Sequence, residues 1–251
     1  MSRFIGCIVP VMLIGAATLA QAGRGSAKKP EGGPANIPAR IEKATLVICS
    51  RVEDATTVIG TGFVVSPDGL VITADHVIMD EENKAQHPGL GVIPSGTTDW
   101  REARVVRRFI RTESDRNIAL LQIVSATNGE SFDFLPLAEP SGPGEPILAC
   151  AYPTVFKGVL LQPFLRAGIL ATGQMSVESG PAMLVLDLAL VSGWSGGPVV
   201  SQVSGGVLGV IRGMSAAEPD SGFSVALRIF PGDLLPPVAD AAADAAPPAS
   251  E

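Results

Sequence analysis

Residues 193–198 read Gly-Trp-Ser-Gly-Gly-Pro, and mostly apolar runs stand on both sides of them. A serine becomes a useful nucleophile only when a base takes its proton, and acyl transfer also needs N–H groups aimed at the oxygen that becomes negative. Glycine lacks a Cβ, so the glycines of this stretch allow a turn tight enough to direct two N–H groups to one point. We expect those groups to belong to Gly193 and Ser195. Alone, the stretch is equally typical of a loop between two strands.

The order of the histidines narrows the choice of scaffold. The same residues satisfy the Gly-x-Ser-x-Gly elbow of α/β-hydrolases, but that fold places its histidine after the serine. This chain has only His76 and His87, both before Ser195, which matches chymotrypsin-type double β-barrels. His76 is the better candidate base because it closes a predicted strand, while His87 lies in a polar loop and is expected to be solvated. Their spacing, with no nearby cysteine, matches no common zinc site, so we expect no metal and no other cofactor.

The two ends of the chain are not expected to belong to the fold. Residues 1–22 have the layout of a secretory signal peptide, with an early arginine, an apolar run and the small-x-small end Ala-Gln-Ala. The run is short for a membrane span, so we expect cleavage after Ala22, no membrane anchor in the mature protein, and a periplasmic or secreted location. Residues 23–40 are predicted to be a flexible leader, and residues 235–251 a disordered Ala/Pro tail with no second folded module after it.

Composition and charge limit the function further. The chain has 251 residues, 46% of them hydrophobic, which suffices for one domain with a sizeable core. Its formal charge is −7, and loss of the signal peptide removes one base (Arg3) and no acid, which gives −8. We therefore expect no nucleic acid partner. Cys49 and Cys150 remain as an even pair after export, so a disulfide between them is left open.

Residues 41–234 are predicted to form one all-β domain. Short β-branched runs recur between turn signals, without a long amphipathic helix. Residues 66–69, Ser-Pro-Asp-Gly, carry proline and glycine where a type I turn needs them, and the hairpin around them ends at His76. Residues 136–146 contain four prolines and two glycines and form a natural link between two halves. The expected fold is the two-barrel fold of chymotrypsin-like and trypsin-like serine proteases.

Five segments, in the right order, resemble those of a known family. They are the first hairpin with its histidine (60–65 and 71–78), the strands 117–121 and 167–170, the serine segment 187–198 and the last strand 222–226. On these residues the chain resembles the protease domain of the high-temperature-requirement (HtrA/Deg) family, trypsin-like serine endopeptidases of the bacterial cell envelope. The resemblance implies polypeptide substrates, His76 as general base and Ser195 as nucleophile. It also implies that substrate backbone lies against the last strand, at Gly222, Phe223 and Ser224.

The chain departs from the family pattern at three points. Asn117 stands where the family has the aspartate that orients the histidine, Trp194 replaces an asparagine or aspartate, and we expect no PDZ domain after the protease domain. An aspartate stabilises the imidazolium, whereas an asparagine offers only an uncharged oxygen, and in chymotrypsin-type proteases this exchange lowers turnover about 10⁴-fold. Asp115, two residues earlier on the same side of an extended segment, and Asp75, beside the histidine, are alternative partners.

The resemblance also bears on substrates. In similar proteases the residue six before the serine floors the pocket for the side chain before the cut, and here it is Ala189, with no acid to hold Arg or Lys. We therefore predict cleavage after small or medium apolar residues, and we expect Asp187 to be structural.

The leading hypothesis is a serine endopeptidase that acts on exported proteins through an acyl-enzyme. The alternatives are a catalytically attenuated protease-fold protein that binds extended peptides by β-addition, and a β-rich structural domain in which the motifs are coincidental. The protein that is cut and the oligomeric state stay open.

Overall fold

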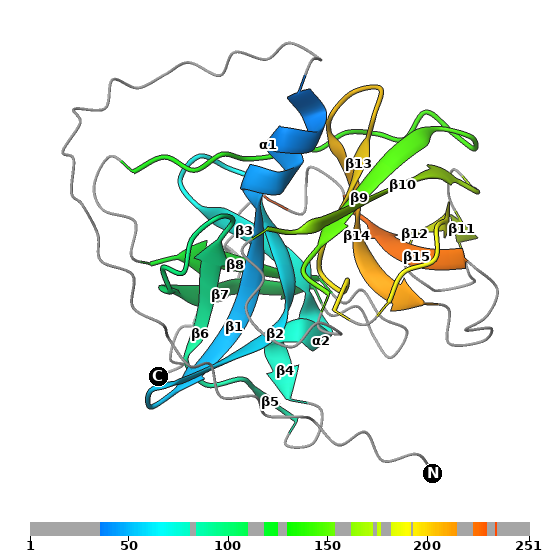
Figure 1. Ribbon diagram of the computed structural model, residues 1–251. Helices are drawn as coiled ribbons and strands as arrows, with labels where there is room; N and C mark the ends of the chain where they lie inside the picture. Colours follow the sequence, from blue (N-terminus) through cyan, green and yellow to red (C-terminus); the bar gives the residue numbers. More distant parts are fainter. Residues whose placement is uncertain are drawn as a thin grey trace, which may run out of the picture.

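The computed structural model describes residues 36–80, 84–109, 118–124, 130–153, 162–172, 175–176, 182–191, 193–214, 223–229 and 234. Two barrels of antiparallel strands lie side by side, and the helix α1 (Ile37–Ala44) leads into the first of them (Figure 1). The predicted two-barrel, all-β fold is confirmed. The expected signal peptide and C-terminal tail lie outside the described residues.

Six strands close the first barrel in the order β1-β2-β3-β8-β7-β6. The predicted turn at residues 66–69 joins β2 to β3, and its Gly69 N–H donates to the Ser66 carbonyl (3.1 Å). The chain then passes from β3 directly into the one-turn helix α2 and the short pair β4–β5. The elements are β1 (Thr45–Val52), β2 (Ala55–Val64), β3 (Leu70–Ala74), α2 (Asp75–Ile78), β4 (Met79–Asp80), β5 (Ala85–Gln86), β6 (Leu90–Pro94), β7 (Arg101–Phe109) and β8 (Ile118–Ile123).

The second barrel follows the order β10-β9-β13-β14-β15-β12, and pairing between β10 and β12 closes the ring. The short strand β11 adds to the outer edge of β12. The strands are β9 (Pro146–Ala151), β10 (Phe164–Leu170), β11 (Met175–Ser176), β12 (Ala182–Asp187), β13 (Pro198–Ser201), β14 (Val207–Met214) and β15 (Phe223–Arg228).

One hydrophobic cluster fills the first barrel and continues into the second. Phe63 and Leu121 of the first barrel belong to it together with Cys150 and Val207 of the second. A separate cluster fills the second barrel and includes Trp194, which is 2% exposed. Burial of apolar surface is the main stabilising contribution to a fold of this size. The two barrels therefore share part of one core.

The helix α1 begins at Ile37, inside the segment that we expected to be a flexible leader. A proline in its first turn is well tolerated, because the N–H that proline lacks has no partner there. Ile41 and Ala44 are fully buried, and the Arg40 guanidinium donates to the Gly205 carbonyl of the second barrel. Within the described ranges, no helix is long and apolar enough to cross a membrane.

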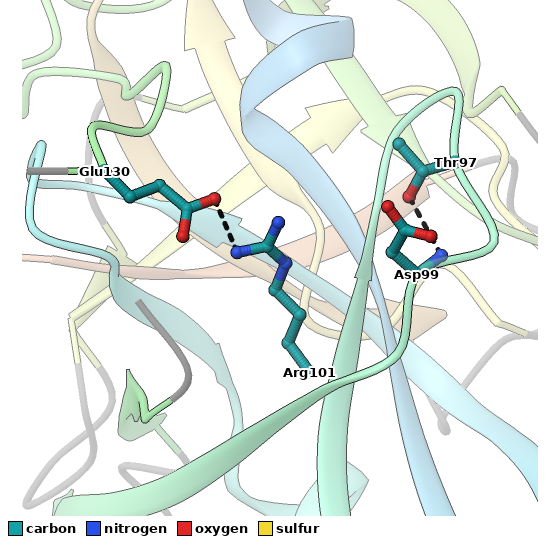
Figure 2. A network of polar contacts seen from close by, with 4 residues as sticks. All are labelled: Thr97, Asp99, Arg101 and Glu130. Carbon is teal, nitrogen blue, oxygen red and sulfur yellow. Dashed lines mark hydrogen bonds and ion pairs between the residues drawn. The ribbon is translucent and has the colours of Figure 1, made fainter. Parts of the chain in front are cut away.

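The chain is anchored to the first barrel shortly before it reaches the link at residues 136–146. Figure 2 shows Arg101 of β7 in an ion pair with Glu130 (2.5 Å), and the same guanidinium lies 5.8 Å from the centre of the Phe132 ring. In the turn before β7, the Asp99 backbone N–H donates to the Thr97 hydroxyl (3.3 Å; Figure 2). Residues 130 and 132, which precede the link, are thus tied to the wall of the first barrel.

Cys49 in β1 and Cys150 in β9 are both fully buried and both free thiols. The disulfide that the sequence left open is not formed in the structure. Burial raises the pKa of each thiol to about 12, so both thiols stay protonated at neutral pH.

Candidate active site

His76 lies in α2, the single helical turn that follows β3, and its side chain is half-buried. The neighbouring Asp75 is 5% exposed, and its carboxylate forms a two-pronged ion pair with Arg108 of β7. Arg108 Nε lies 2.5 Å from Oδ1 and Nη2 lies 2.8 Å from Oδ2. The hydrogen bond to Asp75 also raises the pKa of Arg108 above its ordinary value. Since both carboxylate oxygens bind the guanidinium, Asp75 anchors the histidine turn to β7 and is a poor candidate for the partner of the imidazole.

Asn117 and Asp115, the other two candidate partners of the histidine, lie outside the described residues. The next residue along the chain, Ile118, opens β8 and pairs with Ala74. Because Ala74 is two residues before His76, sheet pairing brings the start of β8 to the start of the histidine turn.

Two glycines of the serine turn have positive φ values, as the sequence predicted for a tight turn. Gly193 and Gly196 have φ values of 91° and 85°, a region that L side chains rarely adopt. A Cβ on Gly196 would lie 2.0 Å from the Thr61 carbonyl oxygen, so only glycine fits. Neither the Gly193 N–H nor the Ser195 N–H donates a hydrogen bond within the described part of the chain. No described residue therefore occupies the two groups that we expected to form an oxyanion site.

The Ser195 hydroxyl lies against the end of β14. Its Oγ donates to the Arg212 carbonyl (3.2 Å), and a Cβ built on Gly213 would come within 3.9 Å of it. The pairing of β13 with β14 stops at Val210, whereas Gly213 and the residue after it still pair with β15 on the other side. On the side away from β15, Gly213 and Met214 therefore have no strand partner among the described residues, and Gly213 lies next to the nucleophile.

The last strand, β15, offers no such edge at Ser224, and the substrate role that the resemblance implies for residues 222–224 stays a prediction. Phe223 pairs with Asp187 of β12, and Ser224 pairs with Leu186 of β12 and with Met214 of β14. A strand with a neighbour on both sides has no edge left to accept substrate backbone. Phe223 is 44% exposed, and the Ser224 hydroxyl is buried with no hydrogen-bond partner among the described residues, while Gly222 lies outside them.

Ala189 follows β12 on the way to the serine turn and is exposed. Its carbonyl accepts a hydrogen bond from the guanidinium of Arg166, an exposed residue of β10. The methyl side chain of Ala189 carries no charge that could hold a basic substrate. Asp187, at the end of β12, is exposed as well.

Three features of the site were not predicted from the sequence. Arg108 contacts the histidine turn, Thr61 contacts the serine turn, and the end of β14 at Gly213 lies beside Ser195. Thr61 lies in the Gly-Thr-Gly segment that we used for the resemblance. The sequence therefore drew attention to this residue, but it did not show that Thr61 contacts the serine turn. Among the described residues, no group of three or more His, Cys, Asp or Glu side chains could hold a metal ion.

Comparisons with known proteins agree with the two-barrel serine protease fold. The family model described as a trypsin-like peptidase domain matches residues 60–210. The chain is 28% identical over 206 residues to the peroxisomal leader peptide-processing protease of Mus musculus, and 28% identical over 172 residues to the putative protease Do-like 14 of Arabidopsis thaliana. These matches cover 78% and 66% of this chain but 34% and 38% of those proteins, so the chain spans little more than a third of their length.

Two solved structures share the fold. The HtrA-type protease AlgW with decapeptide matches with a TM-score of 0.60 and 16% identity, covering 78% of this chain and 64% of that chain. The Rv3671c protease from M. tuberculosis, in its active form, matches with a TM-score of 0.57 and 22% identity, covering 84% of this chain and 89% of that chain.

Proposed function

Because the chain belongs to the family of trypsin-like peptidase domains, we propose that it is a serine endopeptidase that cuts polypeptides through an acyl-enzyme. The observation that supports this most directly is the serine turn. The N–H groups of Gly193 and Ser195 donate to no described residue, while the Ser195 hydroxyl lies beside a strand edge. N–H groups placed in advance around a developing oxyanion are usually the largest single contribution to such catalysis.

In the proposed mechanism His76 is the general base and Ser195 the nucleophile. Ser195 Oγ attacks the substrate carbonyl carbon as its proton passes to the imidazole, and the carbonyl oxygen becomes negative between the two N–H groups. The imidazolium then gives this proton to the leaving amine as the C–N bond breaks, which leaves an ester on Ser195. Water, deprotonated by His76, hydrolyses the ester, and the serine recovers its proton. The mechanism needs no cofactor.

The partner of the imidazole decides how fast this chemistry runs. We propose Asn117 for this position, with Asp115 as the alternative. An uncharged amide stabilises the imidazolium less than a carboxylate does, so turnover is attenuated relative to an aspartate enzyme. Asp75 does not fill the role, because its charge is already neutralised by Arg108.

For the substrate, we propose an extended peptide whose backbone pairs with the end of β14 at Gly213 and Met214, with a small or medium apolar side chain before the cut. The uncharged Ala189 supports this preference. Cleavage of a peptide library chiefly after Arg would contradict it, and cleavage chiefly after Asp or Glu would assign specificity to Arg166 instead. We also propose that the mature protein acts in the periplasm or outside the cell.

The first experiment is intact-mass analysis of the mature protein after exposure to a fluorophosphonate probe, with Ser195→Ala as control. One adduct on the wild type alone supports an activated serine with His76 as its base. An adduct that appears only in the Asn117→Asp variant means that the site is intact but attenuated. No adduct on either protein contradicts the proposed activity.

The attenuated outcome would favour the second candidate function, a protein that grips extended peptides without cutting them. Two observations support this candidate: the asparagine at position 117, and the end of β14, where Gly213 and Met214 pair with β15 and with no other described strand. Addition of a peptide strand to such an edge gives affinity through main-chain hydrogen bonds without any chemistry.

A further inference from the structure

Thr61 of β2 contacts both barrels and the serine turn. It is fully buried. Its N–H donates to the Ser195 carbonyl (3.2 Å), and its hydroxyl donates to the Gly193 carbonyl (3.1 Å). The same hydroxyl oxygen accepts the Tyr152 N–H (2.9 Å), and the Thr61 carbonyl accepts the Thr73 hydroxyl (2.6 Å). One residue of the first barrel thus holds two carbonyls of a turn that belongs to the second.

The position of these two carbonyls affects how the N–H groups of Gly193 and Ser195 are oriented. Each peptide unit is planar, so a fixed carbonyl fixes the orientation of its whole unit. The Ser195 N–H belongs to the unit that lies between the two held units. The Gly193 N–H is joined to its held carbonyl only through the two soft torsions of a glycine, which by itself has many conformations open to it. An external anchor on the Gly193 carbonyl therefore restricts the part of the turn that is least restrained by its own sequence.

We propose that Thr61 is a positioning residue that keeps the two oxyanion N–H groups in place from the first barrel. This inference rests on the proposed function, since it assigns the N–H groups of Gly193 and Ser195 to the oxyanion. Thr61 does not touch the substrate, and it acts through the serine turn. Donors of this kind stabilise the transition state only when they already point at the oxygen that becomes negative.

The alternative is that Thr61 only stabilises the junction of the barrels. Its carbonyl already supports that role, because it accepts the Thr73 hydroxyl and lies against Gly196. A purely structural residue would change the stability of the protein when altered, but it would not change the chemical step of the folded enzyme separately from binding.

The test compares Thr61→Val, which removes the hydroxyl at nearly constant shape, with Thr61→Ser, which keeps it. Thr45→Val is the matched control, because Thr45 is another fully buried threonine whose hydroxyl donates to a carbonyl, that of Ile41 (2.7 Å), away from the serine turn. The rate of fluorophosphonate labelling is measured against probe concentration, which separates probe binding from the chemical step.

We expect Thr61→Val to slow the chemical step by about 10- to 100-fold, below the loss seen when an oxyanion donor is removed outright. Probe binding changes by less than about threefold, and Thr61→Ser and Thr45→Val keep a chemical step close to that of the wild type. A Thr61→Val protein that is folded and labels at the wild-type rate overturns the inference. So does a Thr61→Ser protein that is as slow as Thr61→Val.

A second measurement keeps this result separate from the failure of the proposed function. The N–H groups of Gly196 and Gly197 donate to the Ile211 and Trp194 carbonyls, so their hydrogen exchange reports on the turn whether or not the serine reacts. Faster exchange at these two amides in Thr61→Val, but not in Thr61→Ser, supports the anchor. Unchanged exchange overturns it. If the wild type is not labelled, the kinetic comparison is made with the Asn117→Asp change added to every variant. If that protein is also unreactive, the proposed function fails. The exchange measurement still decides whether Thr61 anchors the serine turn.

Discussion

At the scale of single residues, the ion pair between Asp75 and Arg108 ties the histidine turn to β7. Asp75 is 5% exposed, so removal of Arg108 would leave a carboxylate in the interior without its counter-charge. Loss of one partner of a fully buried pair costs about 3–5 kcal/mol. The Arg108 side chain is 30% exposed, so we expect Arg108→Gln to lower the free energy of unfolding by a smaller amount, about 2 kcal/mol, with slower labelling of Ser195.

The matched control lies on the same strand. Arg104 pairs with Glu102, but their side chains are 69% and 48% exposed, so Arg104→Gln should change stability by less than about 0.5 kcal/mol. Urea unfolding of the two variants gives the comparison. Equal losses for both variants would mean that the Asp75 pair is no more important than a surface pair.

Gly196 supplies a second residue-scale prediction. Gly196→Ala combines a φ of 85° with a Cβ placed 2.0 Å from the Thr61 carbonyl oxygen, and we expect it to abolish labelling of Ser195 and to destabilise the fold by more than about 3 kcal/mol. Gly96 has a similar φ of 74° but nothing within 4 Å of its Cβ position. Gly96→Ala should therefore cost only the backbone strain, about 1–2 kcal/mol, and leave labelling intact. Comparable losses in both variants would argue against the close approach at the serine turn.

At the scale of the strands, the two edges of β14 have different neighbours at its end. Gly213 and Met214 pair with β15 on one side, while the described pairing with β13 has already ended on the other. A peptide bound along that open edge would form main-chain hydrogen bonds, so N-methylation of a backbone N–H that points at the edge removes one of them.

We expect such an N-methyl group to weaken binding of a non-cleavable peptide by about tenfold or more, the worth of one hydrogen bond in a desolvated site. The same group at the next residue of the peptide, whose N–H points the other way, should have little effect. Inhibition constants from competition with the fluorophosphonate probe give the two values. Equal tolerance of both modified peptides would rule out strand addition at this edge.

At the scale of the whole molecule, the sequence predicts those features that depend on residues close together in the chain. The turn at residues 66–69 and the glycines around Ser195 need particular backbone angles, so short stretches carry their own signal, and the histidine order selects the double barrel. Strand neighbours are decided by the closure of the barrel, so the sequence alone does not show which strand ends beside Ser195. Asp75 and Arg108 are 33 residues apart and Thr61 and Gly193 are 132 apart, so no local pattern pairs them. Trp194, unusual for the family, is accommodated because it packs in the second core.

The shared core leads to a prediction about how the molecule unfolds. Cys150 of the second barrel belongs to the cluster that also fills the first barrel, and Cys49 lies in a neighbouring cluster with Tyr152, the residue after β9. Their pKa values of about 12 keep both thiols neutral and unreactive in the folded state at pH 8, whereas unfolded thiols react. If the barrels unfold as one cooperative unit, both cysteines become reactive at the same denaturant concentration.

Brief alkylation across a urea series, followed by peptide mass spectrometry, measures the two midpoints separately. We expect them to coincide, because neither barrel can open without exposing part of the core that the other uses. Alkylation of Cys150 at lower urea than Cys49 would show that the second barrel opens first, and with it the serine turn and the β14 edge. In that case the site would be lost while the histidine turn is still folded, and the midpoint for labelling of Ser195 would follow Cys150 rather than Cys49.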